Sequence, residues 1–357
     1  MKIALLNLPY DNNYGGNLQR YALMKVLQDM GHDVTHINLR FHYHLPWYKT
    51  PYLYTKRIIL KYVFGRSIRI NQERYSQQEY EKRCSITNPF YQKYIKHTEP
   101  ITNLKQLRQH LNFDAYVVGS DQVWRKRIAG RYLKSMFLDF LPRDTKVKRI
   151  AYGVSLGVAE NELNEKEIKQ LTELYCRFDA VSVREDSALE LFKQYGWREP
   201  QATHVLDPTM LLKKEDYIAL IERGNTVPSN GNLFCYILDK TEDKRILISQ
   251  KAEEQHLKPF ELGLDKPACI EQWLRSFADA EYVITDSYHG LVFSIIFNKP
   301  FCLILNKFRG NARFLSLMET LCVNDGMTDF DQKKTEGVIN VEREKSVSFL
   351  IQNINNK

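Results

Sequence analysis

Short apolar runs alternate along the chain with longer segments in which apolar residues recur at helical spacing. The run KIALLNL (2–8) is followed by a turn-rich stretch and then by LQRYALMKVLQDMG (18–31), whose pattern predicts an amphipathic helix closed by Gly31. The apolar run DVTHINL (33–39) comes next. A strand, a helix and a second strand in this order form a βαβ unit, which predicts a parallel sheet.

The alternation continues to the end of the chain and restarts once. Strand-to-loop units are expected at 113–124, 149–157 and 180–184, with helices at 160–178 and 185–196. After THVLDPTMLL (203–212) come strands at 233–238, 281–286 and 300–306, and helices at 242–255, 269–280, from 287 onward and at 311–321. We therefore predict an α/β fold with two Rossmann-like domains, 1–204 and 205–357, that face a cleft. In such folds ligands bind at the carboxyl ends of the parallel strands.

Composition narrows the class of protein. The chain has 357 residues, 43% of them hydrophobic, as in a globular protein long enough for two domains. No apolar run approaches the roughly 20 residues that span a bilayer, and the N-terminus turns polar too early for a signal peptide. Six scattered cysteines without a C-x-x-C pair fit a reducing compartment. We expect a cytoplasmic protein, soluble or peripheral to a membrane, and its formal net charge of +8 favours anionic partners.

One segment, 41–74, has a composition of its own and opens a longer basic and aromatic insertion, 41–100, in the first domain. Seven Lys or Arg residues face one acid, Glu73, and eight aromatic residues are interleaved with them. Cations and aromatic rings together are typical of a patch that contacts anionic lipid. The alternative is a solvated insertion whose aromatic residues pack on the first domain. A nucleic-acid partner is not expected, because no motif accompanies the charge.

The first candidate site is a glycine-rich stretch, YDNNYGGNLQ (10–19). Gly15, Gly16 and Asn17 lie between the first strand and the first helix, where backbone N–H groups can hold an anion at the helix N-terminus. The spacing is not G-x-G-x-x-G, which disfavours a dinucleotide. A turn that requires glycine for its backbone conformation is the alternative.

Two charged residues stand at predicted strand ends. Asp121 presents a carboxylate where it can accept a hydroxyl proton or hold a sugar hydroxyl, and a cap for the next helix is the alternative. Arg184 stands where a strand meets a helix, and its planar guanidinium suits a carboxylate or a phosphate. An ion pair with a neighbouring acid is the alternative for Arg184.

The most informative stretch is VITDSYHGLVFSIIFNKPF (283–301), in which a buried-looking strand runs into Ser287, Tyr288 and His289. A helix N-terminus favours a neutral imidazole at His289 when the site is empty, and a bound anion favours the imidazolium. His289 is thus a candidate proton donor that becomes charged when an anionic substrate arrives. A structural cap or core histidine is the alternative.

Further charged residues follow the last predicted strand. Lys307, Arg309 and Arg313 are expected at the same edge of the sheet as His289. A D-x-D pattern, Asp329 to Asp331, matches metal-dependent sugar-nucleotide enzymes, but it lies in a polar loop and is interpreted as chance.

In chain order, DNNYGGNLQRYAL, DAYVVGSDQVW, YGVSLG, SVREDSALELF, VLDPTMLL and TDSYHGLVFSIIFNKPF resemble the polysaccharide pyruvyl transferase family, over about residues 10–320. The resemblance implies two Rossmann-like domains arranged as in GT-B glycosyltransferases, with the acceptor on the first and the donor on the second. It also implies phosphoenolpyruvate as donor and a cyclic pyruvate ketal on a sugar of a surface polysaccharide as product. No metal or nucleotide cofactor is implied, and the acceptor is expected to be lipid-linked, which would fit segment 41–74.

The resemblance also assigns roles to residues. Arg184 matches a donor-site arginine, and the histidine of an Arg-x-His motif falls on His289. The arginine of that motif falls on Ser287, so the chain departs from the pattern there, and our hypothesis is that Arg309 or Arg313 supplies the missing cation. His289 is then the acid, Arg184 with Arg309 or Arg313 the clamps, and Asp121 the base or acceptor contact.

Two other functions remain open on the sequence. One is a GT-B glycosyltransferase that uses a nucleotide sugar, because fold alone does not give function. The other is a catalytically silent glycan- or membrane-binding module, which the serine at position 287 favours.

Overall fold

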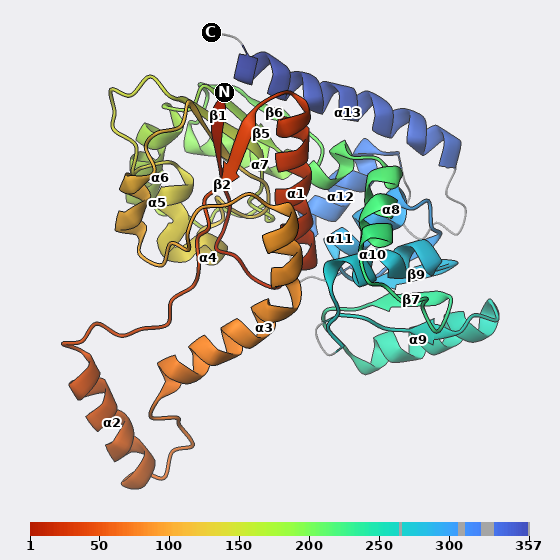
Figure 1. Cartoon of the computed structure of the whole chain (residues 1–357), viewed down its shortest axis with the longest axis horizontal. Helices are drawn as coiled ribbons and strands as arrows, with labels where there is room; N and C mark the ends of the chain where they lie inside the picture. Colours follow the sequence, from red (N-terminus) through yellow and green to blue (C-terminus); the bar gives the residue numbers. More distant parts are fainter. Residues whose placement is uncertain (264–265, 306–310, 323–331, 356–357) are drawn as a thin grey trace.

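The computed structural model describes residues 1–263, 266–305, 311–322 and 332–355. It contains two parallel sheets, each flanked by helices (Figure 1). The first sheet has the strand order β2-β1-β3-β4-β5-β6 and the second β10-β9-β7-β8. The strands of the first sheet are β1 (Lys2–Leu6), β2 (Asp33–His36), β3 (Ala115–Val118), β4 (Lys148–Val154), β5 (Ala180–Val183) and β6 (Ala202–His204); those of the second are β7 (Leu233–Tyr236), β8 (Pro259–Phe260), β9 (Tyr282–Thr285) and β10 (Phe301–Leu303).

Helices connect these strands and cover their faces. Those around the first sheet are α1 (Tyr14–Asp29), α2 (Thr50–Tyr62), α3 (Gln72–Tyr94), η1 (Leu104–Gln109), α4 (Lys126–Ala129), η2 (Gly130–Tyr132), α5 (Leu133–Met136), α6 (Glu165–Tyr175) and α7 (Asp186–Tyr195). Those that follow are η3 (Pro208–Leu211), α8 (Lys214–Arg223), α9 (Glu242–Glu254), α10 (Ile270–Asp279), α11 (Tyr288–Ile296), α12 (Ala312–Thr320) and α13 (Gln332–Asn355).

Strand β1 shows how the sequence builds the core. Successive side chains of a strand point to opposite faces, so Ile3 and Leu5 join one buried cluster while Ala4 and Leu6 join another. The first cluster contains residues of α1, α3 and α13 and continues into the helices of the second sheet. The second contains Trp124, which stacks on Phe137 on the opposite face. Both faces of the sheet are therefore covered, as the continuous apolar strands require.

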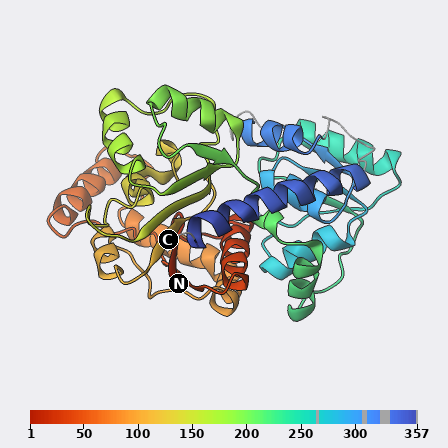
Figure 2. The ribbon, with the colours of Figure 1, turned by 90° about the horizontal axis from the view of Figure 1, so that it is seen from above.

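Helix α13 returns from the second sheet to the first (Figure 2). Lys148 of β4 donates to the carbonyl oxygen of Asn353, and the backbone N–H of Leu206 donates to the hydroxyl of Ser346. The predicted division of the chain at residues 204 and 205 assigns this helix to the second half, whereas its contacts reach the first sheet. That division stays a prediction.

The segment 41–74 divides into a packed beginning and an exposed arm. Phe41 packs against Tyr80 and Tyr132 in the first half of the molecule. Helix α2, by contrast, has no buried residue and projects away from the body (Figure 1). Trp47 is 86% exposed and Phe64 66% exposed. The packing alternative is therefore wrong for the arm, residues 47–66, and right for the residues that lead into it.

Candidate active site

A cavity of about 480 Å³ lies between the two sheets. Parallel strands bring their carboxyl ends to one edge, and the cavity is lined there by Asp121, which follows β3, and by Ser287 to His289, which follow β9. Gly15 in the first turn of α1 and Arg313 in the first turn of α12 complete this part of the wall. Gly15, Asp121, Ser287, Tyr288, His289 and Arg313, all predicted from the sequence, thus meet at one cavity.

His289 is held between the two halves of the molecule. His289 is 7% exposed. Its ring lies so close to Gly15 that a Cβ on Gly15 would fall 2.0 Å from Nδ1. The Nε2 atom has no hydrogen-bond partner among the described residues and lies 3.8 Å from Oδ2 of Asp207. This nitrogen therefore faces a buried carboxylate from just beyond hydrogen-bond distance, where a protonated ring would be stabilised.

Burial lowers the pKa of His289 to about 4, although Asp207 and Asp121 oppose the shift. The imidazole is therefore neutral near neutral pH in the empty cavity. The sequence predicted the direction of this shift but attributed it to the helix N-terminus, whereas burial is the largest cause. The phosphate or carboxylate of a ligand would raise the pKa of His289 again.

Asp207, which the sequence analysis quoted only within a motif, is the centre of a buried network. Its carboxylate accepts hydrogen bonds from Gln19, from Arg184 and from the backbone and hydroxyl of Thr209. Burial alone would raise the pKa of Asp207, but Arg184 and His289 outweigh it and lower the pKa to about 2. Asp207 therefore stays ionised beside His289 and limits the fall of the histidine pKa.

Arg184 lies beneath the cavity rather than in its wall. Its side chain is 1% exposed, pairs with Asp207, and lies 3.3 Å from Asp121. Burial opposes the charge of Arg184, but Asp207 raises its pKa above the ordinary value. The ion-pair alternative therefore describes Arg184, and its role as a donor clamp stays a prediction.

Asp121 occupies a strained position at the end of β3. Its φ of +79° lies in the left-handed region, which Asp adopts more readily than most side chains. The carboxylate lies 3.3 Å from Arg184 and 3.5 Å from Arg313. Burial would raise the pKa of Asp121, but the two guanidinium groups lower it. The helix-cap alternative is wrong, because the next helix, α4, begins only at Lys126.

Tyr288 separates the two arginines. The Cζ atom of Arg184 lies 5.1 Å from the centre of the Tyr288 ring and that of Arg313 lies 5.2 Å from it, both within cation–π range. Burial and the nearby Arg184 lower the pKa of Arg313. Arg313 lines the cavity. The described residues do not include Lys307, Arg309, Asp329 or Asp331.

Gly16 and Asn17 are not in the cavity wall. Helix α1 begins at Tyr14, earlier than predicted, so both residues belong to its first turn. The N–H of Gly16 donates to Asn13, and the Asn17 amide donates to the carbonyl oxygens of Asp11 and Asn13. These groups are already satisfied by the chain, so the predicted anion loop is instead a capped helix start. Gly15 has a different role, because its lack of a side chain leaves room for the ring of His289.

The sequence analysis missed several charged residues of the cavity wall. Arg125 and Arg127 follow Asp121 at the same sheet edge, which is a signal that sequence could have supplied. Arg83 comes from α3, far from any strand end, and nothing local marks it. The further wall residues that it did not select are Asp11, Asn12, Asn13, Tyr14, Gln122, Ile128, Tyr236, Leu238, Gly263, Asp286 and Phe314.

Within the described ranges, no group of three or more His, Cys, Asp or Glu side chains is arranged to hold a metal ion. In the same part of the chain, no helix combines the length and the apolar character needed to cross a bilayer.

A sequence model described as polysaccharide pyruvyl transferase matches residues 13–307. The chain belongs to the polysaccharide pyruvyl transferase family. The matched range includes every described residue of the cavity wall except Asp11, Asn12, Arg313 and Phe314. A search of curated proteins finds no match to this chain.

Solved structures resemble this chain at low sequence identity. UDP-GlcNAc 2-epimerase from Neisseria meningitidis, bound to UDP-GlcNAc, has a TM-score of 0.50 and 7% identity over 99% of this chain and 100% of its own. The corresponding epimerase from Methanocaldococcus jannaschii has a TM-score of 0.49 and 11% identity over 99% of each chain. An alpha-glucosyltransferase in complex with UDP has a TM-score of 0.46 and 11% identity over 99% of this chain and 96% of its own. The Neisseria epimerase supports the GT-B-like arrangement, and the likeness extends to the fold alone.

Proposed function

We propose that the cavity binds phosphoenolpyruvate and transfers its pyruvyl group to two hydroxyls of one sugar, forming a cyclic ketal. The observation that carries this proposal is that His289, a buried histidine whose Nε2 has no hydrogen-bond partner among the described residues, lines the same cavity as Arg313. Phosphoenolpyruvate carries a phosphate and a carboxylate on an enol, so it requires cations and a proton donor at the same place.

His289 supplies the proton in this mechanism. The neutral imidazole takes up a proton when the anionic donor arrives, because the negative charge offsets the burial that holds its pKa at about 4. The imidazolium then protonates the methylene carbon of phosphoenolpyruvate, which leaves the adjacent carbon electrophilic. Asp207, 3.8 Å away, stabilises the charged ring.

The remaining steps balance with groups of the cavity wall. One sugar hydroxyl attacks the electrophilic carbon and loses its proton to Asp121, which is ionised beside its two arginines. The bond between carbon and the phosphate oxygen then breaks, and phosphate leaves. The second hydroxyl attacks the same carbon, and its proton and that held by Asp121 return to phosphate and to the histidine. The products are the ketal and inorganic phosphate.

Arg313 is our candidate for the cation that the family motif places at position 287. It reaches the cavity from α12, while Ser287 makes no side-chain cap at the start of α11 and so leaves the first N–H groups of that helix for an anion. We expect Arg313→Ala to raise the KM for phosphoenolpyruvate by about tenfold or more, since a charge-assisted hydrogen bond is lost. The KM for the acceptor should not change, and an unchanged donor KM would remove Arg313 from the clamp.

Deuterium labelling tests the transfer itself. Full-length protein is incubated in D₂O with phosphoenolpyruvate and a panel of lipid-linked oligosaccharides, and phosphate release is followed. Because the proton on the new methyl group comes from His289, which exchanges with D₂O, that methyl group should carry one deuteron. The acceptor should gain the mass of pyruvate less water, with deuterium in place of one hydrogen. Label transferred from a nucleotide sugar, with none from phosphoenolpyruvate, would establish a glycosyltransferase instead. Ligand binding without turnover would establish the silent module.

The acceptor proposed here is linked to a lipid, and the arm of residues 47–66 supports contact with a membrane. Helix α2 carries the exposed Tyr52 and Tyr62 together with Lys56 and Lys61, which have no carboxylate at ion-pair distance in the described part of the chain. Arg57, by contrast, is held by Glu73 through two bonds of 2.6 Å. The one acid of segment 41–74 is thus neutralised, and the outer face of the arm is positive. An anionic bilayer surface offers the complementary charge together with an apolar layer for the rings.

A further inference from the structure

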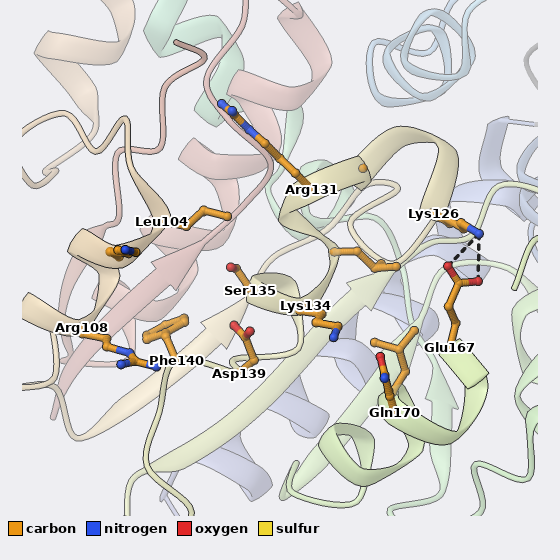
Figure 3. A pocket seen from close by; sticks show the side chains of 14 residues that line it. Leu104, Arg108, Lys126, Arg131, Lys134, Ser135, Asp139, Phe140, Glu167 and Gln170 are labelled. Atoms are coloured by element: carbon orange, nitrogen blue, oxygen red, sulfur yellow. Dashed lines mark hydrogen bonds and ion pairs between the residues drawn. The ribbon is translucent and has the colours of Figure 1, made fainter. Parts of the chain in front are cut away.

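A second hollow, of about 710 Å³, lies in the first half of the molecule and has no role in the mechanism above. It is enclosed by η1, by the run of short helices α4, η2 and α5, and by α6. Figure 3 shows Lys134, Ser135 and Asp139 at its centre, with Arg108 and Phe140 on one side and Lys126 and Glu167 on the other. Its volume is typical of a small-molecule site.

The wall of this hollow is strongly cationic. Lys105, Arg108, Lys126, Arg131 and Lys134 face only two carboxylates, those of Asp139 and Glu167. Glu167 is already paired with Lys126 at 2.8 Å. Within the described part of the chain, Lys105, Arg108 and Lys134 have no carboxylate at ion-pair distance. Arg108 and Lys134 act on the carboxylate of Asp139 from beyond ion-pair distance, so the three cations, which come from two separate elements, leave an excess of positive charge that can meet an anion.

Beneath the cations the wall is apolar. Leu133, Phe140 and Leu171 line the hollow and are at most 8% exposed. A ligand that suits both layers carries more than one negative charge next to an apolar or ring-shaped group. A single carboxylate would leave part of this charge unmatched, whereas a diphosphate ester offers several acceptor oxygens to guanidinium and ammonium donors.

The hollow and the catalytic cavity each share lining residues with a third hollow. This smaller hollow, of about 320 Å³, shares Gly130 and Arg131 with the hollow of about 710 Å³ and shares Ile128 with the catalytic cavity. The smaller hollow is also lined by Phe41 and Tyr43, at the base of the arm. The three hollows are thus linked through residues 128–131, which gives an extended acceptor a continuous set of lining residues.

We propose that the hollow lined by Lys105, Arg108 and Lys134 is a diphosphate subsite. It holds the acceptor glycan by the end that bears the diphosphate, while the sugar of the acceptor reaches His289. The subsite deepens the proposed function and depends on it for the identity of the acceptor. The diphosphate can belong to a polyprenyl lipid or to a sugar nucleotide, and both present the same group to these cations.

Calorimetry on the full-length protein tests the subsite without turnover. Inorganic pyrophosphate is titrated into wild type, into Arg108→Ala/Lys134→Ala, into the control Lys166→Ala/Lys169→Ala and into Arg313→Ala. The control removes two exposed lysines of α6 outside the hollow. We expect the Arg108/Lys134 variant to bind about tenfold or more weakly while the Lys166/Lys169 control retains wild-type affinity. Equal affinity in the Arg108/Lys134 variant and the control, or a loss confined to Arg313→Ala, would overturn the subsite. Melting curves check that each variant is folded.

Two further ligands identify the source of the diphosphate. Tighter binding of geranyl diphosphate than of pyrophosphate supports a lipid-linked acceptor, and tighter binding of UDP-N-acetylglucosamine supports a sugar nucleotide. In the transfer assay, the Arg108/Lys134 variant should show a raised KM for the diphosphate-linked acceptor and an unchanged KM for phosphoenolpyruvate. If no transfer occurs with any acceptor while pyrophosphate still depends on Arg108 and Lys134, the proposed function fails and the subsite stands.

Discussion

At the scale of single residues, the candidate site is a set of side chains that constrain one another. Gly15 leaves room for the His289 ring, Asp207 faces its Nε2, and Arg184 keeps Asp207 ionised. Each of these partners is distant in sequence from the histidine. Removing any of these partners should therefore change the position or the pKa of His289, and the reaction should change as a consequence.

His289→Ala tests the proton donor directly. We expect kcat to fall by about 10²–10⁴-fold, the usual contribution of a positioned acid or base. Phosphoenolpyruvate should still bind, because Arg313 and the start of α11 are intact. Phosphate release measured with wild type and variant at equal substrate decides the matter, and a variant with wild-type kcat would exclude His289 as the acid.

Gly15→Ala and Gly16→Ala form a matched pair in one helical turn. A Cβ at position 15 would fall 2.0 Å from Nδ1 of His289, whereas at position 16 its nearest neighbour would be 3.6 Å away. Displacing a catalytic group by about 1 Å can lower the reaction rate by about 10²-fold. We therefore expect kcat to fall by about that factor in Gly15→Ala and to stay unchanged in Gly16→Ala. Similar kcat values for the two variants would show that the ring contact has no part in catalysis.

At the scale of elements, the sequence predicted the order of strands and the helices between them well, because their periodicity is local. It missed α3, which is polar and contains Pro89, and the two-residue strand β8. It also missed α13, whose bonds to Lys148 and Leu206 are made with residues far away in the chain. His289 and Asp121 could be selected because each follows a buried strand. Asp207 could not be selected, because the residues that place it in the site, Gln19 and Arg184, come from two other parts of the fold.

The arm around α2 is the element whose role can be measured in isolation from catalysis. We expect full-length protein to sediment with vesicles of anionic phospholipid and not with neutral vesicles. Lys56→Glu/Lys61→Glu should weaken this binding by about tenfold or more, at roughly 1 kcal/mol for each cation near the surface. The charge-matched control is Lys166→Glu/Lys169→Glu on α6. Sedimentation that is equal in both variants, or a concentration-dependent dimer without lipid, would contradict membrane docking.

At the scale of the whole molecule, stability and ligand binding are linked to pH through His289. Its folded-state pKa, about 4, lies below the ordinary value of 6.5, so the unfolded chain binds more protons between these values. Stability from this group is complete above pH 6.5 and is lost as the pH falls toward 4. Asp207, with its pKa lowered to about 2 from 3.8, adds a second loss at lower pH.

His289→Gln, which cannot titrate, should remove the part of this slope between pH 6.5 and 4. Melting temperatures of wild type and variant across that range give the measurement. Calorimetry near pH 5.5 in buffers of different ionisation enthalpy should also show proton uptake when phosphoenolpyruvate binds wild type, and less uptake in the variant. Equal uptake in both proteins would show that another group takes the proton.

The first turn of α1 reaches across the molecule. The hydroxyl of Tyr14 bonds to the backbone of Ala268 on both its N–H and its carbonyl, and its ring stacks on Trp273. Gly15, the next residue, packs against the ring of His289. The contacts of Tyr14 therefore help to fix the spacing between the proposed acid, His289, and the proposed base, Asp121, so loosening them should slow both proposed proton transfers together.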